Sequence, residues 1–338
     1  MKNIKLLQTL SDDEKSKNSD LYSAGPYWKY KSEKAIYQIK KWGIEDFRGQ
    51  SSGIATSYSD NIIYDVRNEL NFKGRLVSKV FSLPLIKKVF KSQLSYTKFY
   101  IDSFLRNLSI VYKKNESVIK LLGKYKFDRT TEFGCIQKFN FNGKDYSTNY
   151  LDMAHRIDNL SKKFDFKKIN SFFEIGGGFG SNAHFLITNF PNIKKFIYLD
   201  AVPNLYIGTE YLKFFFGNAV KDYLKLRDLK KVSFSKDNEL EILCIPPWLI
   251  ENLDVKVDHF HNANSFVEMP KKVIENYINF VKQISVAQIS LLSYDKYDSE
   301  STFNPELLND FFNKELKTEW KEDLIKEYGR KTLYLTSS

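Results

Sequence analysis

The sequence has little of what marks a secreted or membrane-spanning protein. Among 338 residues it contains only two cysteines, Cys135 and Cys244, which argues against a disulfide framework and is typical of a reducing compartment. No hydrophobic run approaches the roughly 20 residues needed to cross a bilayer. The N-terminal segment turns acidic after a short apolar stretch, unlike a signal peptide. We therefore expect a cytoplasmic protein without a transmembrane segment.

Acidic residues are also in deficit. The 52 lysines and arginines against 41 aspartates and glutamates give a formal net charge of +11. Such a charge favours anionic partners, among them nucleotide-linked sugars, phosphorylated glycans, membrane surfaces and nucleic acids. The sequence has no internal repeat and no low-complexity segment, and its length fits two domains or one elaborated domain. We expect a mostly helical N-terminal region over residues 1–160 and an α/β domain over 161–338.

Several patterns organise the N-terminal region, whose first 20 residues are polar and expected to be loosely ordered. Recurring apolar and aromatic residues predict a helix over 27–42 and a mostly helical stretch over 61–125. Basic residues within the latter form either a membrane-binding face or a solvated one. The polar break at 49–53 is either a loop closing over a ligand or a plain turn. Asn-Gly within 137–146 predicts a β-hairpin.

One stretch, residues 171–200, organises the C-terminal region. It reads as a buried strand ending in Glu174 and Ile175, then a glycine loop, a helix capped by Ser181 or Asn182, and a second strand ending in Asp200. Asp200 follows Gly178 by 22 residues, the usual distance from a nucleotide-binding glycine loop to an acid that holds a ribose hydroxyl. This spacing predicts a nucleoside-cofactor site.

The glycine pattern discriminates between cofactors. Dinucleotide-binding loops usually read G-x-G-x-x-G, whereas this loop reads E-x-G-x-G-x-G, with Glu174, Gly176, Gly178 and Gly180. That looks like motif I of class I S-adenosylmethionine (AdoMet)-dependent methyltransferases. The cofactor-binding residues expected from the motif and from the strand ends are Glu174, Gly176, Gly178, Gly180, Asp200, Ala201, Pro246 and Asn262.

Apolar runs and turn signals continue the α/β pattern to the C-terminus. We expect strands over 241–245, 255–263, 287–292 and 332–336, and helices over 203–216, 270–283 and 305–328. Pro246-Pro247-Trp248 follows the first of these strands and forms either a flank for an adenine ring or a packed turn. The result is a Rossmann-like sheet, in which ligands bind beyond the carboxyl ends of the strands.

Three motifs together resemble a bacterial family of sugar O-methyltransferases. They lie at 173–216, at 244–248 (CIPPW) and at 262–270 (NANSFVEMP), and the resemblance covers roughly residues 165–295. It implies a class I methyltransferase fold, AdoMet as methyl donor and a sugar hydroxyl as acceptor, in polysaccharide or glycosylated-metabolite pathways. Only the helical character of the N-terminal half matches.

Polar side chains crowd the end of the strand over 255–263. A sugar hydroxyl must lose its proton as it is methylated, and histidine has the pKa best suited to this near neutral pH. His259 and His261 share one strand face, and His261 is our first candidate for the base. Glu268 is the second, and Asn264 and Asn262 are expected to orient the acceptor or the methionine end of AdoMet. The alternative is that both histidines are structural, as we expect for His184.

No metal is expected to be required. Asp258, His259, His261 and Glu268 could form a site for a divalent ion, but Asp258 should face away from the histidines and no known ligand spacing occurs.

The sequence thus predicts an AdoMet-dependent O-methyltransferase acting on a sugar or sugar substituent of a surface glycan. The alternatives are a small-molecule or phosphate-group methyltransferase of the same fold, and a non-catalytic AdoMet-fold subunit of a glycan assembly complex. The expected partner is an anionic glycan or nucleotide-sugar acceptor, with peripheral membrane contact and a homodimer both open. Nucleic acid is not expected, because an N-P-P-Y type motif is absent.

Overall fold

The computed structural model describes residues 4–17, 20–23, 25–45, 47–48, 113, 115–134, 138–294, 305–316, 319–325 and 330–337. The chain divides into two compact units. The first comprises residues 1–36, 160–326 and 330–338, and the second comprises 37–159 and 327–329. The beginning of the chain therefore clusters with the C-terminal sheet.

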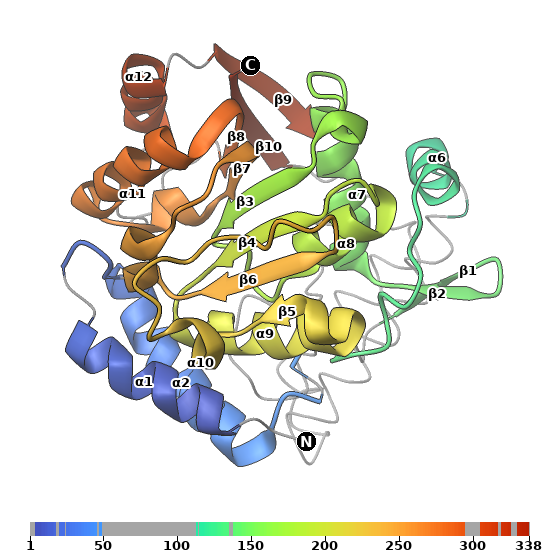
Figure 1. The fold of residues 1–338 in the computed structure, drawn as a ribbon. Helices are drawn as coiled ribbons and strands as arrows, with labels where there is room; N and C mark the ends of the chain where they lie inside the picture. The colour runs from blue at the N-terminus through green and yellow to red at the C-terminus, as the bar shows by residue number, and fades with distance from the viewer. Residues whose placement is uncertain are drawn as a thin grey trace, which may run out of the picture. The chain divides into compact units, whose positions relative to one another are not determined.

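An eight-stranded sheet forms the centre of the first unit (Figure 1), in the order β5-β6-β4-β3-β7-β8-β10-β9. Neighbouring strands in the part β5-β6-β4-β3-β7-β8 pair in parallel, whereas β10 is antiparallel to both β8 and β9. The expected Rossmann-like α/β sheet is confirmed, but the inserted antiparallel strand departs from the dinucleotide-binding order. The strands are β3 (Ser171–Ile175), β4 (Lys195–Leu199), β5 (Val220–Lys221), β6 (Glu241–Ile245), β7 (Val257–Ala263), β8 (Ser285–Tyr294), β9 (Glu319–Ile325) and β10 (Arg330–Ser337).

Helices cover both faces of the sheet, as its continuous apolar strands require. All five residues of β6 are buried, as are the last four of β3 and of β4. Helix α8 connects β3 to β4, and α9 leads from β4 towards β5 and β6, so the chain moves in one direction across the sheet. Helix α11 connects β7 to β8 in the opposite direction. Because such crossovers are right-handed, the two sets lie on opposite faces. The helices of this unit are α1 (Ile4–Lys17), the start of α2 (Pro26–Trp42), α8 (Ser181–Asn189), α9 (Val202–Phe216), α10 (Tyr223–Leu226), α11 (Lys271–Ile284) and α12 (Pro305–Leu316).

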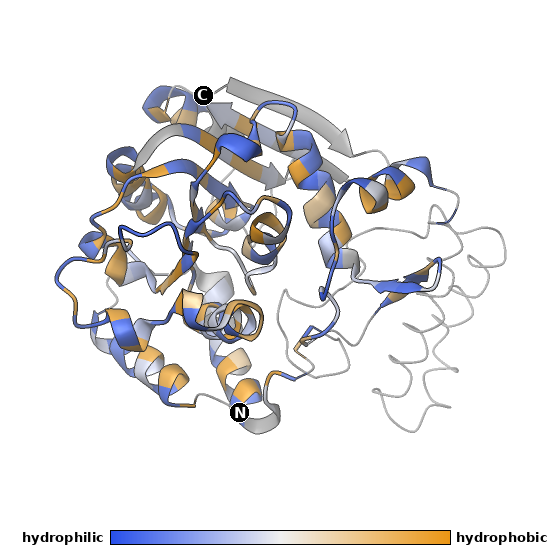
Figure 2. Cartoon of the chain, turned by 45° about the vertical axis from the view of Figure 1, so that its right-hand side comes forward, coloured by the Kyte–Doolittle hydropathy of each residue, from blue (hydrophilic) through white to orange (hydrophobic). Residues whose placement is uncertain are grey.

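Amphipathic patterning fixes how these helices pack. In α11 the buried residues recur at helical spacing and include Val273, Tyr277 and Val281. Figure 2 shows hydrophobic and hydrophilic residues alternating along the helical ribbons. Phe266 stacks on Tyr277 and on Phe312 of α12, with ring centroids 6.5 and 5.7 Å apart. This cluster fixes the segment after β7 against both helices.

Two predictions of secondary structure are wrong. Residues expected to be loosely ordered form α1, because Leu6, Leu7 and Leu10 are buried and give the helix an apolar face. The helix expected over 305–328 ends at Leu316, and β9 follows. β9 pairs with β10 from Glu319 opposite Thr336 to Ile325 opposite Arg330, so sheet hydrogen bonds override the local helical pattern.

The second unit contains α6 (Glu116–Lys124), β1 (Phe139–Phe141), β2 (Lys144–Tyr146) and most of α7 (Thr148–Leu160). The predicted hairpin is confirmed, with Asn142 and Gly143 both at positive φ in its turn. The break at 49–53 and the helical pattern over 61–112 lie outside the described residues, as does Cys135. None of the helices that the structure describes is long and apolar enough to cross a membrane.

Candidate functional site

The candidate site lies at the carboxyl ends of β4, β3 and β7, within the first unit. The chain leaves β3 towards β4 on one side, and β7 lies on the other side of β3. This is the topological switch point at which open α/β sheets bind ligands. The glycine loop follows β3, Asp200 follows β4, and Asn262 lies near the end of β7. The structure therefore brings the predicted cofactor-binding residues of the three strands to one edge.

The glycine loop has a backbone that other residues rarely adopt. Gly176, Gly178 and Gly180 have φ values of 77°, 62° and 83°, in the region that favours glycine. A Cβ atom on Gly176 would lie 2.2 Å from Ser265 Oγ. Gly176 and Gly178 therefore allow the tight turn after β3, and Gly180 occupies the N-cap position of α8.

The predicted side-chain cap of α8 is wrong. Gly180 is the N-cap in a left-handed conformation, without a side-chain cap hydrogen bond. Asn182 instead donates from its side chain to Glu174 Oε1 at 2.8 Å, and both residues are buried. Glu174 therefore links the end of β3 to the first turn of α8.

Asp200 joins the end of β4 to the glycine loop. Its Oδ2 accepts from Gly178 N at 2.8 Å and its Oδ1 from Ala201 N at 2.7 Å. Burial raises the pKa of Asp200 to about 8, against the opposing effect of these hydrogen bonds and one from Asn204, and the charge of Glu174 raises it further. A protonated carboxyl group has one O–H donor and still has acceptor lone pairs, so Asp200 can form hydrogen bonds with ligand hydroxyls.

The end of β7 is fastened to β3 by Asn262 and Ser265. Asn262 is buried, and its Nδ2 donates to Ile175 O at 2.9 Å and to Ser265 Oγ at 2.5 Å. Its Oδ1 accepts from Phe266 N at 3.3 Å. The Asn262 amide thus sets the position of the loop that faces Gly176. The local sequence does not single out Ser265, because Ile175 O, to which its hydroxyl donates, lies 90 residues away.

His259 and His261 face the same side of the sheet, as predicted, and both bond to Ser290 of β8. His259 Nε2 lies 2.7 Å and His261 Nδ1 2.8 Å from Ser290 Oγ. His259 is fully buried and stacks on Phe172 with centroids 4.8 Å apart. Burial lowers its pKa to about 4, so it is a neutral core residue. His261 is 3% exposed, and its role as a base stays a prediction.

Glu268 and Asn264 lie at the rim of the same edge, around the short 3-10 helix η6 (Ser265–Glu268). Glu268 is half-buried, and its Oε2 accepts from Trp28 Nε1 at 2.7 Å. Asn264 begins η6 with a φ of 66°, and its backbone N–H donates to Leu292 O at 2.8 Å. The contact with Trp28 was missed, since 240 residues separate the partners.

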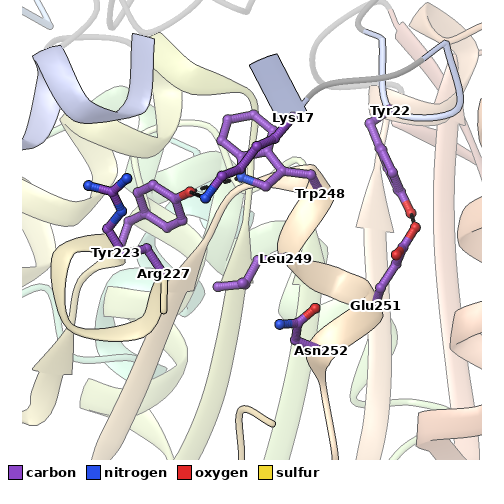
Figure 3. Close-up of a pocket in the computed structure, with 8 residues that line it drawn as sticks. All are labelled: Lys17, Tyr22, Tyr223, Arg227, Trp248, Leu249, Glu251 and Asn252. Atoms are coloured by element: carbon purple, nitrogen blue, oxygen red, sulfur yellow. Dashed lines mark hydrogen bonds between the residues drawn. The ribbon is translucent and has the colours of Figure 1, made fainter. Parts of the chain in front are cut away.

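The segment after β6 forms a packed turn around Trp248. Trp248 is 8% exposed, and its Nε1 donates to Tyr223 Oη at 3.0 Å. Beside it lies a polar cavity of about 180 Å³. Figure 3 shows Tyr22 and Glu251 pointing towards each other on one side, and Lys17, Tyr223 and Trp248 close together on the other. The cavity is lined by Lys17, Tyr22, Tyr223, Arg227, Trp248, Leu249, Glu251 and Asn252.

The remaining candidates have structural partners. His184 Nδ1 lies 3.0 Å from Tyr211 Oη, and its ring stacks on Phe215. Asp258 accepts from the backbone N–H groups of Asn170 and Ser171. Within the described residues no group of three histidine, cysteine, aspartate or glutamate side chains could hold a metal ion.

The sequence matches no protein-family model and no curated protein. Among solved structures it is similar to the methyltransferase domain of bacterial CtHen1, at 8% identity and a TM-score of 0.40, over 56% of this chain and 98% of that domain. It is also similar to magnesium protoporphyrin IX methyltransferase from Synechocystis PCC 6803 with bound SAM, at 8% identity and a TM-score of 0.36, over 56% of this chain and 80% of that chain. The similarity to human N-acetylserotonin methyltransferase in complex with SAM has 9% identity and a TM-score of 0.35, over 56% of this chain and 53% of that chain. Because these likenesses are remote, assignment of the site depends on the geometry of this chain.

Proposed function

We propose that this protein is an AdoMet-dependent O-methyltransferase whose acceptor is a sugar hydroxyl. The observation that carries the proposal is the bond between Asp200 and Gly178 N at the switch point. This hydrogen bond joins Asp200, a side chain that can bind the two hydroxyls of a ribose, to a glycine loop of the E-x-G-x-G-x-G pattern. A dinucleotide site is less well supported, because the loop lacks G-x-G-x-x-G and the sheet contains an inserted antiparallel strand.

The described residues fit the cofactor in size and chemistry. The positive-φ glycines leave a backbone that a ligand can approach closely, and Asp200 would accept from the ribose hydroxyls. Ala201 and Pro246, at the ends of β4 and β6, would flank the adenine. Bound AdoMet supplies an electrophilic methyl group, and the protein has to hold the acceptor hydroxyl in line with it and remove the hydroxyl proton.

Glu268 is now the better candidate for that proton transfer. A base must come within hydrogen-bond reach of the acceptor, and Glu268 is half-buried at the rim. His261 is almost fully buried and bonded to Ser290, so it needs a rearrangement to reach a substrate. The assignment of a sugar as acceptor is supported by the sequence resemblance and by the net charge of +11, which suits phosphorylated or nucleotide-linked sugars.

The first experiment is calorimetric titration with S-adenosylhomocysteine, comparing the wild type with Asp200→Ala. We expect micromolar binding that the substitution weakens at least tenfold, since a tenfold loss is about 1.4 kcal/mol and each of the two hydrogen bonds to the ribose hydroxyls contributes about 0.5–1.5 kcal/mol. Absence of binding to the wild type would exclude the proposal.

The second experiment is transfer of labelled methyl from AdoMet to a panel of free, phosphorylated and nucleotide-linked sugars. Glu268→Gln should reduce kcat at least 100-fold, while affinity for S-adenosylhomocysteine is retained. Transfer only to phosphate groups or to non-sugar hydroxyls would favour a small-molecule enzyme. Binding without transfer to any acceptor would favour a non-catalytic subunit.

A further inference from the structure

A short N-terminal segment contacts the elements that follow two non-adjacent strands. We call residues 20–23 and 25–28, which follow α1 and include the first turn of α2, the N-terminal strap. Tyr22 donates to Glu251 in η5 (Pro247–Asn252), which follows β6. The ring of Tyr22 also lies against Tyr277 of α11, with centroids 6.4 Å apart, and α11 comes after β7 in the chain. One side chain therefore connects the segments beyond β6 and β7.

Further contacts fix the strap on the β7 side. Asn276 Nδ2 donates to Leu21 O at 3.2 Å, and Lys272 Nζ lies 2.9 Å from Asp20 Oδ2. Trp28 Nε1 donates to Glu268 Oε2 at 2.7 Å. At the other end, Lys17 at the C-terminus of α1 lies 3.5 Å from Tyr223 Oη, so α1 anchors the strap beside β6.

The sheet order places the nucleoside site between these two sets of contacts. β4 and β3 lie between β6 and β7, and their carboxyl ends carry Asp200 and the glycine loop. The strap therefore bridges elements that follow β6 and β7, the two strands that flank β4 and β3 in the sheet. In Figure 1, α1 lies on the side to which the arrow of β6 points. Burial raises the pKa of Tyr277, and the charge of Asp200 raises it further, so the strap's contact residue lies within electrostatic range of the site.

We propose that the N-terminal strap closes over the nucleoside-cofactor site and must detach from Glu251 and Glu268 for the cofactor to exchange. This inference rests on the proposed function for the identity of the cofactor. Attachment to Glu268 also couples closure of the strap to the acceptor site. The indole N–H of Trp28 orients the Glu268 carboxylate only when the strap is closed. Trp28 is thus a positioning residue, and cofactor exchange and orientation of the base are linked through one segment.

The test combines amide hydrogen exchange with the rate of ligand release. In the wild type, saturating S-adenosylhomocysteine should slow exchange in peptides covering residues 4–28 at least tenfold, because the bound state lowers the fraction of open strap. Trp28→Phe removes one charge-assisted hydrogen bond and should speed dissociation of S-adenosylhomocysteine about tenfold. Lys272→Met removes an exposed ion pair and should speed it about twofold.

The matched control is Lys144→Met, which removes a comparable exposed ion pair with Asp128 at 3.0 Å, in the second unit. Its dissociation rate should equal that of the wild type. Normal binding with unchanged exchange over residues 4–28 would overturn the strap alone, even if Trp28→Phe did not fold. Absence of binding to the wild type would overturn the proposed function and the strap with it.

Discussion

At the scale of single residues, Gly176 shows how two constraints combine at one position. Its φ of 77° is unfavourable for other residues, and a Cβ atom would meet Ser265 Oγ at 2.2 Å. We predict that Gly176→Ala lowers the free energy of unfolding by about 2–4 kcal/mol, from backbone strain and the clash together. Urea unfolding measures this change.

Gly143→Ala is the control for that substitution. Gly143 has a similar φ of 82°, but nothing lies within 4 Å of its added Cβ atom. Strain alone should therefore lower the free energy of unfolding by about 1 kcal/mol. Equal effects of the two substitutions would show that Ser265 does not confine the loop.

Asp200 makes a pH-dependent prediction at the same scale. Its pKa is raised to about 8 by burial, above the ordinary value of about 3.9 expected in the unfolded chain. The folded protein therefore holds a proton that the unfolded chain releases, and the contribution of Asp200 to stability is lost as pH rises from about 4 to about 8. Asp200→Asn lacks this loss. The melting temperature of the variant minus that of the wild type should therefore increase as pH rises from 5 to 8.

The same substitution should weaken binding of S-adenosylhomocysteine at least tenfold, since an amide offers one acceptor oxygen in place of two. A variant that is more stable at pH 8 yet binds less would identify Asp200 as a residue retained for ligand binding. A stability difference that does not change with pH would contradict the raised pKa.

At the scale of elements, β7 and β8 depend on Ser290, whose hydroxyl lies between two buried histidines. The pKa of His259 is lowered to about 4 by burial, whereas the unfolded value is about 6.5. The unfolded chain therefore binds the proton first, and stability is lost as pH falls from about 6.5 to about 4. His259→Phe should reduce this loss, as measured by urea unfolding at pH 7 and pH 5. An unchanged difference between the two pH values would argue against a neutral, buried His259.

Ser290→Ala tests the shared hydroxyl directly. Both imidazoles lose a hydrogen-bond partner within the core, and an unpaired buried polar group costs about 1–3 kcal/mol. We predict a loss of about 2 kcal/mol in the free energy of unfolding at pH 7. Ser290→Thr, which retains the hydroxyl, should recover part of that loss.

At the scale of the whole molecule, the net charge of +11 makes a prediction about acceptors. Steering of anionic substrates weakens as ionic strength rises, because the Debye length falls from about 10 Å at 0.1 M to about 3 Å at 1 M. We predict that kcat/KM for a nucleotide-linked sugar falls about tenfold between 0.05 and 0.5 M NaCl. A neutral sugar acceptor is the control and should change less than twofold. Equal salt dependence for both would argue against an anionic acceptor.

Several elements could be predicted because their signals are local. The glycine spacing and the acid 22 residues after Gly178 placed the candidate site at one sheet edge. The apolar run at 241–245 and the Asn142-Gly143 turn predicted β6 and the hairpin, both of which the structure confirms. In each case the determining residues are neighbours in the chain, so propensity and periodicity are sufficient.

Contacts between residues that are remote in sequence could not be predicted and were found only in the folded chain. β9 forms where a helix was predicted because β10 supplies its hydrogen bonds. Ser265 confines Gly176, and Trp28 bonds to Glu268 across 240 residues. Such partners leave no pattern in the local sequence, since the free energy that selects them comes from pairing and burial in the folded chain. The loop motif could therefore be predicted from sequence, whereas the contacts of the strap and the burial of His261 beside Ser290 required the fold.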